Sequence, residues 1–435
     1  MVAAKRDLEV RRKSSMKTAS VVIGAAFGDE GKGLLVDHLA SKASNPIVVR
    51  FSGGANAGHT VRTPDGRKHV FSHFGSGIFA GAPTFLGQHF ISNPILFKRE
   101  RERLVALKIW SRVYVDSRAF ITTPYDMLIN QIAEASRGSG KHGSVGVGIN
   151  ETIERNQHPK FSMRHGETGN LRREEIRTRL ISIREGWVPQ RLTRLGVDRP
   201  INDLTRSLHE KITSNEIMEE FISDLFAYYG STENTTPKWL FENINHDAII
   251  FEGAQGLALD QNHAWFPHVT RANTGLDNVL EIAHEVGIED LNVHYMHRAY
   301  ATRHGAGPFP HELSKAPYPR IVDETNKPNP FQDSLRFGLP DLDLVARDIS
   351  TDFAKANIQA RAHLVVTCLD QVDGDISYVK NDVEKRNPEL DFLLDFQSAL
   401  VDAGVTPASV MTSHGPTRKT IKTALTTPSP LPGKT

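Results

Sequence analysis

A glycine-rich turn near the start of the chain combines acids and a lysine in a pattern that suits phosphate binding. The turn follows the apolar run 21–23 and reads Gly28-Asp29-Glu30-Gly31-Lys32-Gly33. Helical spacing of apolar residues begins directly after it, so the unit is predicted to be strand, loop and helix. Backbone N–H groups at such a helix start favour an anion, glycines let the backbone approach it, and Lys32 adds a positive charge. The turn therefore predicts a phosphate-binding loop.

The turn differs from the common nucleoside-triphosphate loop, in which a serine or threonine follows the lysine and holds magnesium. Here Gly33 follows Lys32 and has no hydroxyl. A bound metal would need another oxygen ligand, and Asp29 is the nearest candidate. Mg²⁺ takes few protein ligands and completes its shell with water and phosphate oxygens. The alternative is a structural strand-to-helix turn with a solvated acid pair.

A second glycine-rich loop carries a side chain that titrates near neutral pH. The apolar run 47–51 is followed by Ser52-Gly53-Gly54-Ala55-Asn56-Ala57-Gly58-His59-Thr60. A single histidine in a loop is usually exposed and has no function, but this loop directly follows a second predicted strand. Asp29 could accept a proton and His59 could donate one, which is the acid–base pair that group transfer needs.

Short β-rich segments that end in glycine or polar residues must position these loops. They cover 20–24, 47–51, 248–251, 291–296 and 364–367. Amphipathic stretches of helical length lie between them, for example 214–229 and 278–286. This alternation predicts an α/β fold with a mostly parallel central sheet covered by helices, whose ligands collect at the carboxyl ends of the strands. The arginine-rich segment 156–203 is expected to be a peripheral insertion or a subunit-contact region.

Composition narrows the class of protein. The chain has 435 residues, a net charge of +1, 39% hydrophobic residues and one cysteine, Cys368. These values are ordinary for a soluble globular protein, and they give no reason to expect a nucleic-acid partner. No apolar run is long enough to span a bilayer, so no membrane partner is expected. A single cysteine excludes an internal disulfide and fits a reducing compartment, so a cytoplasmic location is predicted.

Five blocks, in order along the chain, resemble the signature of adenylosuccinate synthetases. The first two are the glycine-rich loops at 28–33 and 53–60, and the third begins Phe251-Glu252-Gly253-Ala254-Gln255-Gly256 and runs on to Thr270. The fourth runs from 299 to 312, and the fifth combines Leu369-Asp370 with Ser413-His414-Gly415-Pro416. The resemblance implies a catalytic domain over 19–425 that is similar to P-loop NTPases with helical and loop insertions. Residues 1–18 are expected to form a disordered tail, and 426–435 a flexible one.

This resemblance implies an enzyme, a C–N ligase that joins L-aspartate to IMP at the expense of GTP in purine nucleotide biosynthesis. The products would be adenylosuccinate, GDP and phosphate. A purine 6-oxygen is a poor leaving group, so it is first phosphorylated and then displaced by the aspartate amine. In the family roles, Asp29 removes the N1 proton, His59 donates a hydrogen bond or proton as the γ-phosphoryl group moves, and Lys32 neutralises charge. Mg²⁺ is the implied cofactor, held by Asp29 and the carbonyl of Gly58.

Further contacts carry over by the same resemblance. Arg336 would bind aspartate, Arg303 would either touch phosphate or pair with Glu312, and a homodimer is implied. The residues implied to bind GTP are Gly28, Asp29, Glu30, Gly31, Lys32, Gly33, Asp370, Ser413, His414 and Gly415. Those implied to bind IMP are Asp29, Glu30, Gly31, Lys32, Asn56, Ala57, Gly58, His59, Ser144, Gln255 and Thr270.

Two departures concern the IMP phosphate. The threonine expected there becomes Val145 on an ungapped reading, so Ser144 must serve or the contact is absent. The arginine that the family sends across the dimer falls on Pro159, and either Arg155 or Arg164 could replace it.

Two further departures concern the other substrates. The aspartate loop normally carries a threonine pair and several arginines, but here it keeps Arg336 alone. Cys368 stands where a lysine usually precedes the base-reading Leu-Asp pair, so ATP stays open as the donor.

Two alternatives to the implied function therefore remain. The first is the same chemistry on another purine nucleotide such as dGMP, as in viral relatives that make 2-aminoadenylosuccinate. The second is a non-catalytic nucleotide-binding module. Those viral relatives tend to lose the carboxylate that Asp29 retains, which favours IMP.

Overall fold

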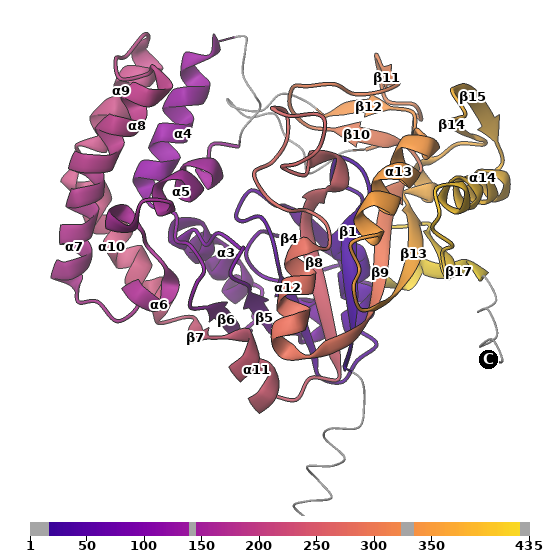
Figure 1. The fold of residues 1–435 in the computed structure, drawn as a ribbon, viewed down its shortest axis with the longest axis horizontal. Coiled ribbons are helices and arrows are strands. Elements are labelled where there is room, and N and C mark those ends of the chain that lie inside the picture. Colours follow the sequence, from indigo (N-terminus) through magenta and orange to yellow (C-terminus); the bar gives the residue numbers. More distant parts are fainter. Residues whose placement is uncertain (1–16, 139–144, 323–334, 427–435) are drawn as a thin grey trace, which may run out of the picture.

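The structure is a computed structural model that describes residues 17–138, 145–322 and 335–426 (Figure 1). Its centre is a ten-stranded sheet in the order β17-β16-β13-β9-β1-β8-β2-β5-β6-β7. Neighbouring strands run parallel, except that β17 is antiparallel to β16. The predicted α/β fold with a mostly parallel sheet is confirmed. The strands are β1 Lys17–Gly24, β2 Pro46–Arg50, β5 Thr84–Leu86, β6 Val113–Asp116, β7 Glu233–Thr235, β8 Ala248–Gly256, β9 Ile288–Arg298, β13 Gln359–Thr367, β16 Ser409–Ser413 and β17 Ile421–Thr426.

The five strands predicted from the sequence are adjacent in this sheet, as β13, β9, β1, β8 and β2. Four of them extend well beyond the predicted apolar segments, because strand pairing also holds polar residues. Lys17 and Thr18, for example, pair with Ile288 and Asp290 of β9. They lie inside the predicted N-terminal tail, whose residues 1–16 are outside the described residues. Thr426 likewise ends β17, while the rest of the predicted C-terminal tail is not described.

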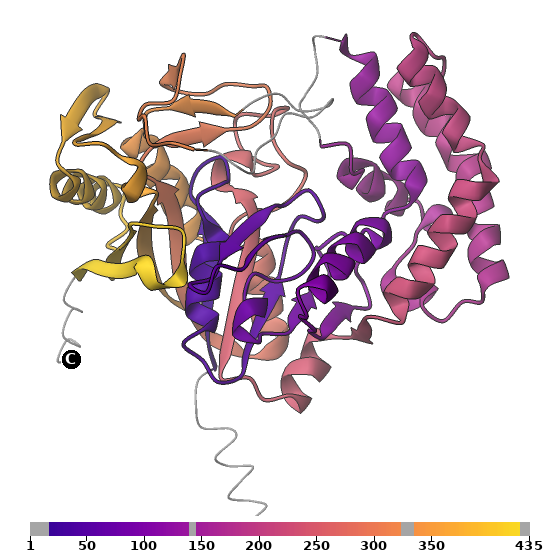
Figure 2. The same cartoon turned by 180° about the vertical axis from the view of Figure 1, so that it is seen from behind.

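Helices cover both faces of the central strands, which explains their almost uninterrupted apolar sequences. Val21 and Ile23 of β1 belong to a core formed with α12 (Asp277–Val286), α13 (Leu342–Phe353) and α14 (Glu389–Asp402). Val22 faces the other way and packs with Leu35 of α2 (Lys32–Ala40). Turning the molecule by 180° exposes the opposite layer (Figure 2). Both layers hold the ends of the central strands in fixed positions.

A separate helical lobe lies beyond the β6 and β7 edge of the sheet, opposite the C-terminal strands (Figures 1 and 2). It has its own apolar core. The arginine-rich segment 156–203 lies within it, and its role in subunit contact stays a prediction. The predicted helices 214–229 and 278–286 correspond to α10 and α12. The remaining helices are α3 Pro94–Ala106, α4 Pro124–Ser136, α5 Ile149–Asn156, α6 His165–Thr168, α7 Arg173–Ser182, α8 Val188–Leu195, α9 Asp203–Ile212, α10 Asn215–Tyr229 and α11 Pro237–Asn243.

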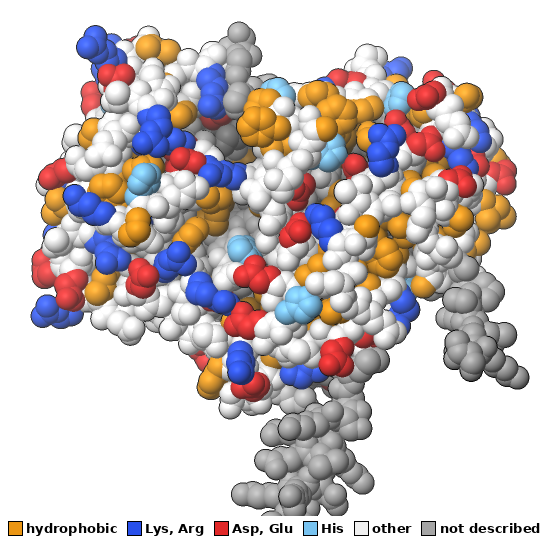
Figure 3. Space-filling view, in the orientation of Figure 1, with side chains coloured by type: hydrophobic (Ala, Val, Ile, Leu, Met, Phe, Trp, Pro, Cys, Tyr) orange, Lys and Arg blue, Asp and Glu red, His pale blue; other side chains and the backbone are white. Residues whose placement is uncertain are grey.

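Three small sheets complete the described fold. One joins β10 (Ala301–Arg303), β12 (Arg336–Gly338) and β11 (Glu312–Leu313), and another joins β3 (His59–Arg62) to β4 (Lys68–Phe71). The third pairs β14 (Ile376–Lys380) with β15 (Val383–Asn387). Across the described ranges, every helix is too short or too polar to cross a membrane. Acidic and basic side chains are interspersed on the face in Figure 3.

Candidate active site

A cavity of about 1030 Å³ lies where the carboxyl ends of the central strands meet the helical lobe. Its wall is built from the loops after β1 and β2, the segments after β8 and β9, and parts of α4 and α5. This is the edge at which ligands of parallel sheets collect. Basic side chains outnumber acidic ones in the wall, which carries Asp29, Glu134 and Glu151 against Lys32, Arg62, Arg137, Arg271, Arg298 and Arg303. The chain as a whole is nearly neutral, so this local excess favours anionic ligands.

The loop between β1 and α2 forms one wall of the cavity. Gly28, Asp29 and Gly31 all have left-handed backbone, with φ of 95°, 63° and 85°. Glycine adopts this conformation without strain, and aspartate is among the few other residues that tolerate it. The loop turns sharply at these three residues, and α2 begins at Lys32.

Glu30 braces this loop from inside. One oxygen of its carboxylate accepts hydrogen bonds from the N–H groups of Gly28 and Ala26, at 2.8 and 3.1 Å. Its other oxygen lies 3.0 Å from Nζ of Lys32, and both side chains are buried. A Cβ at Gly24 would collide with this carboxylate, so glycine there makes room for it. Contact between Glu30 and a nucleotide stays a prediction.

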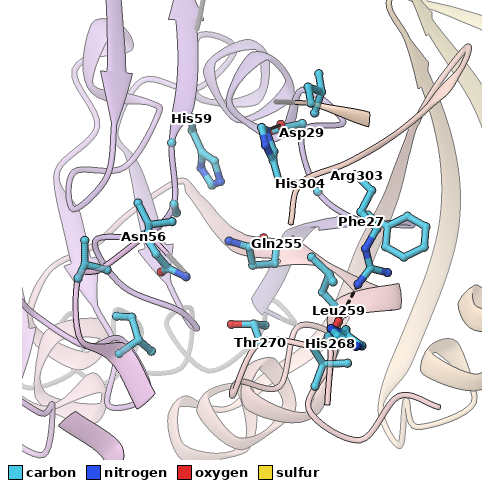
Figure 4. A pocket seen from close by; sticks show the side chains of 18 of the residues that line it. Phe27, Asp29, Asn56, His59, Gln255, Leu259, His268, Thr270, Arg303 and His304 are labelled. Atoms are coloured by element: carbon cyan, nitrogen blue, oxygen red, sulfur yellow. Dashed lines mark hydrogen bonds and ion pairs between the residues drawn. The ribbon is translucent and has the colours of Figure 1, made fainter. Parts of the chain in front are cut away.

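Asp29 lies in the cavity wall, held by the last residue of β9 and by the residue that follows β10 (Figure 4). Its Oδ2 lies 2.9 Å from Nε2 of His304, and its carbonyl oxygen accepts a hydrogen bond of 2.5 Å from Nε of Arg298. Burial alone would raise the pKa of Asp29, but the His304 hydrogen bond and the charges of Arg298 and Lys32 lower it to about 2. Asp29 is therefore a carboxylate at neutral pH.

His59 stands on a buried polar cluster under the second loop. Its Nδ1 lies 2.6 Å from Oε1 of Glu252, a β8 residue that also accepts hydrogen bonds from the N–H and hydroxyl of Ser76. Arg50 lies 4.0 Å from the same carboxylate. Burial lowers the pKa of His59, and Glu252 offsets that effect only in part. With Nδ1–H donated to Glu252, Nε2 is the nitrogen that can serve a ligand.

Glu252 offers a test of this cluster. Burial would raise its pKa, but the charges of His59 and Arg50 lower it from 4.5 to about 2. The carboxylate therefore stabilises the fold above pH 4.5 and loses that contribution as the pH falls towards 2. We expect Glu252→Gln to reduce the free energy of unfolding by roughly 3 kcal/mol near pH 7, and by much less near pH 3.

Urea denaturation of both proteins at the two pH values measures this difference. The matched control is Glu242→Gln, at an exposed position of α11, which should change stability little at either pH. A Glu252→Gln difference that is equally large at both pH values would contradict the pKa assignment.

The structure brings most of the predicted site residues to this one cavity. Figure 4 shows His59 and Asn56 on one side of Gln255, Asp29 on the other, and Thr270 nearby. The predicted residues that line the cavity are Gly28, Asp29, Gly31, Lys32, Gly33, Asn56, Ala57, Gly58, His59, Gln255 and Thr270. Ser144 lies outside the described residues, whereas Val145 lines the wall.

The residues predicted to read guanine lie beside the cavity rather than in its wall. Asp370 follows β13 and Ser413 ends β16, two strands that pair in parallel. The Ser413 hydroxyl donates to the carbonyl of Gly415 at 2.9 Å, and Nε2 of His414 lies 2.8 Å from Glu389. Gln371, next to Asp370, does line the cavity. The four residues predicted to read guanine, Asp370, Ser413, His414 and Gly415, thus form a second group at the same edge of the sheet.

Two of the predicted arginines have other partners in this structure. Arg336 forms a forked ion pair with Glu312, with nitrogen–oxygen distances of 2.7 and 2.5 Å, and donates to the carbonyls of Gly305 and Gly307. Arg303 lies over the ring of Phe27 and donates to three backbone carbonyls, those of Ala306, Pro308 and His268. The direct ion pair of Glu312 is thus with Arg336, and Arg303 interacts with this carboxylate only electrostatically.

The two candidates for a partner-subunit arginine differ sharply. Arg155 is completely buried, pairs with Asp126 at 2.8 Å and donates to the carbonyls of Ile121 and Phe161. It is a structural residue of the helical lobe and cannot reach out of the subunit. Arg164 is partly exposed and lies over Phe120, so it alone of the two stays open for that role.

The donor atoms around Asp29 fit Mg²⁺. Asp29 is ionised, and Gly58 lies exposed in the same cavity wall. Among the described residues, no group of three or more His, Cys, Asp or Glu side chains could cage a metal. A cation here would depend on one carboxylate, a carbonyl, water and phosphate oxygens, which is the coordination that Mg²⁺ accepts and zinc sites do not.

Two site residues, Arg298 and His304, were not predicted from the sequence. Arg298 comes two residues after the predicted strand 291–296, so the tendency of ligand-binding residues to follow strands could have indicated it. Nη1 of Arg298 lies 3.3 Å from the hydroxyl of Tyr300, which in turn donates to Gln371. His304 carries no such signal, because its position depends on how β10 folds back over the β1 loop.

Comparisons with known proteins agree with this geometry. A family model described as adenylosuccinate synthetase matches residues 21–336. The adenylosuccinate synthetase of Borrelia duttonii is 30% identical over 317 residues, covering 68% of this chain and 65% of that protein. That of Parabacteroides distasonis is 31% identical over 302 residues, covering 67% and 65%. The match thus spans about 65% of the length of these curated relatives.

Two solved structures share the fold over nearly the whole chain. A fully ligated adenylosuccinate synthetase from Plasmodium falciparum has a TM-score of 0.66 at 19% identity, covering 93% of this chain and 99% of that one. The cyanophage S-2L succinoaminodeoxyadenylate synthetase, bound to dGMP and to dATP as an energy donor, has a TM-score of 0.59 at 16% identity. It covers 95% of this chain and 97% of that one.

Proposed function

Since this chain belongs to the adenylosuccinate synthetase family, we propose that it ligates L-aspartate to IMP with GTP as the phosphoryl donor. The products are adenylosuccinate, GDP and phosphate, the first committed step from IMP to AMP. The observation that carries the proposal is the meeting of Asp29, His59 and Lys32 in one basic cavity, from two loops at the carboxyl ends of parallel strands.

The ionised Asp29 accepts the N1 proton of the purine, which turns the 6-oxygen into a nucleophile. That oxygen attacks the γ-phosphorus of GTP, and the bond to the leaving GDP oxygen breaks. The aspartate amine then attacks C6, phosphate leaves and the amine nitrogen loses a proton. In its imidazolium form, which the Glu252 carboxylate stabilises, His59 donates from Nε2 to an oxygen of the moving phosphoryl group.

Phosphoryl transfer is mainly positioning and neutralisation of charge. Lys32 and the N-terminus of α2 supply positive charge to the phosphates from the β1 loop. Asp29 and the Gly58 carbonyl would hold Mg²⁺, which neutralises phosphate oxygens when bound.

The other substrates are assigned to neighbouring groups. Asp370 reads the guanine of GTP, with Ser413, His414 and Gly415 beside it. Arg336 binds an aspartate carboxylate, which must first replace Glu312 as its partner. Gln255, Thr270, Asn56 and the loop backbone orient IMP. On the basis of the family, the protein is also proposed to be a homodimer in the cytoplasm. Its substrates are small molecules.

Phosphate release from the purified full chain tests the proposal. The protein is mixed with Mg²⁺, aspartate and either IMP or dGMP, and with either GTP or ATP. We expect turnover with IMP and GTP that requires aspartate. Turnover with dGMP but not IMP would contradict the substrate assignment. No turnover with any pair would favour a nucleotide-binding module.

A further inference from the structure

His304 contacts the proposed base without having a part in the mechanism above. It directly follows β10, and its Nε2 lies 2.9 Å from Oδ2 of Asp29. Both side chains line the cavity, with about a quarter of each exposed, 24% for His304 and 28% for Asp29. Because the carboxylate can only accept, Nε2–H is the donor. A ligand that meets Asp29 therefore meets a carboxylate already engaged by this imidazole.

The number of oxygens that a carboxylate offers decides which purine edge it can hold. Guanine and other 2-amino purines present N1–H and an amino group side by side, two donors that match the two oxygens of one carboxylate. Hypoxanthine presents N1–H alone. A carboxylate with one oxygen already engaged suits the single donor better than the pair.

Asp370 provides an internal comparison. It is exposed, and none of the described residues engages its carboxylate. Its two oxygens can therefore face the two donors of a guanine. The two carboxylates differ in their surroundings in the way that a guanine reader and a hypoxanthine reader should differ.

We propose that His304 is a specificity-determining residue that makes Asp29 select purines without a 2-amino group. The inference deepens the proposed function and rests on it. By engaging Oδ2, His304 takes one of the two acceptors that a 2-amino purine edge requires. The amino group would also meet the imidazole N–H, and two donors facing each other repel.

The surroundings keep this arrangement rigid. Arg298 holds the Asp29 carbonyl, so the loop cannot simply move away from His304. The neighbouring Arg303 is fixed by three carbonyls, and β10 pairs with β12. A 2-amino purine would have to break the His304–Asp29 bond in place.

Two variants at one position test the inference. His304→Leu removes the donor, whereas His304→Gln can place an amide N–H near the position of Nε2. We measure kcat/KM for IMP and for dGMP with GTP, Mg²⁺ and aspartate. The preference for IMP should fall by about tenfold or more in His304→Leu and return to within about threefold of the wild type in His304→Gln. His284→Leu, at an exposed position of α12 outside the cavity, is the matched control and should keep the wild-type preference.

Binding separates this inference from the proposed function. Calorimetric titration of IMP and dGMP into each variant needs no turnover, and thermal melting checks that each variant is folded. A wild type that binds IMP more tightly than dGMP but has no activity would contradict the proposed function alone. The inference is overturned if His304→Leu keeps the wild-type preference, if both His304 variants change it equally, or if the wild type binds neither nucleotide.

Discussion

Asp29→Asn is expected to lower kcat by about 10³-fold while the protein stays folded, because it removes the carboxylate proposed to accept the N1 proton. Asparagine has nearly the same shape and, like aspartate, tolerates the left-handed backbone found here at φ 63°. Its amide oxygen can still accept from His304, and the Arg298 bond goes to the main chain. The substitution therefore isolates the charge. Steady-state phosphate release with IMP, GTP and aspartate measures the loss.

The control for this variant is Asp203→Asn, at an exposed position of α9, which should leave kcat unchanged. Thermal melting shows whether Asp29→Asn is folded. Activity within about tenfold of the wild type in a folded protein would exclude Asp29 as the base.

His59→Asn should lower kcat by roughly 10²- to 10⁴-fold, the range expected when a positioned acid is removed. Asparagine can place an N–H where Nδ1 now donates to Glu252, so the buried cluster with Ser76 and Arg50 keeps its partner. Asparagine has no equivalent of Nε2, so it cannot donate to the phosphoryl group. His59→Gln supplies an amide near Nε2 instead, so it should recover part of the rate if His59 donates a hydrogen bond.

Single-turnover measurements of phosphoryl transfer show whether the lost step is the first one. His284→Asn, on the exposed face of α12, is the control. If His59→Asn slows turnover by less than about tenfold, His59 has no part in the phosphoryl step.

The centre of the fold could be predicted because its strands are buried on both faces. Burial on both sides gives β1 and β8 short apolar runs at 21–23 and 248–251, and β9 a mostly apolar segment that a few polar residues interrupt. The strands nearest the helical lobe gave no such signal, since β5 and β7 have three residues each. The lobe itself depends on helix–helix packing that periodicity alone does not arrange in space.

The site was predictable where chemistry and position coincide along the chain. Asp29, His59 and Gln255 each come at or just after the end of an apolar strand segment, where a parallel sheet places its ligands. His304 and the Arg336–Glu312 pair could not be foreseen, because both depend on how β10, β11 and β12 fold over the loop. Glu252 lies between these cases: a carboxylate in an apolar strand indicates a buried partner, but not which one.

The carboxylate of Glu30 gives the β1 loop an anion of its own. It satisfies two loop N–H groups and balances the charge of Lys32, so this lysine already has an anionic partner without a ligand. A phosphate that binds there must replace the Glu30 carboxylate as the partner of Lys32 and of the loop N–H groups. A small anion makes few other contacts that offset this replacement, whereas a nucleotide makes contacts along its whole length. The loop therefore discriminates by the size of the whole ligand as well as by charge.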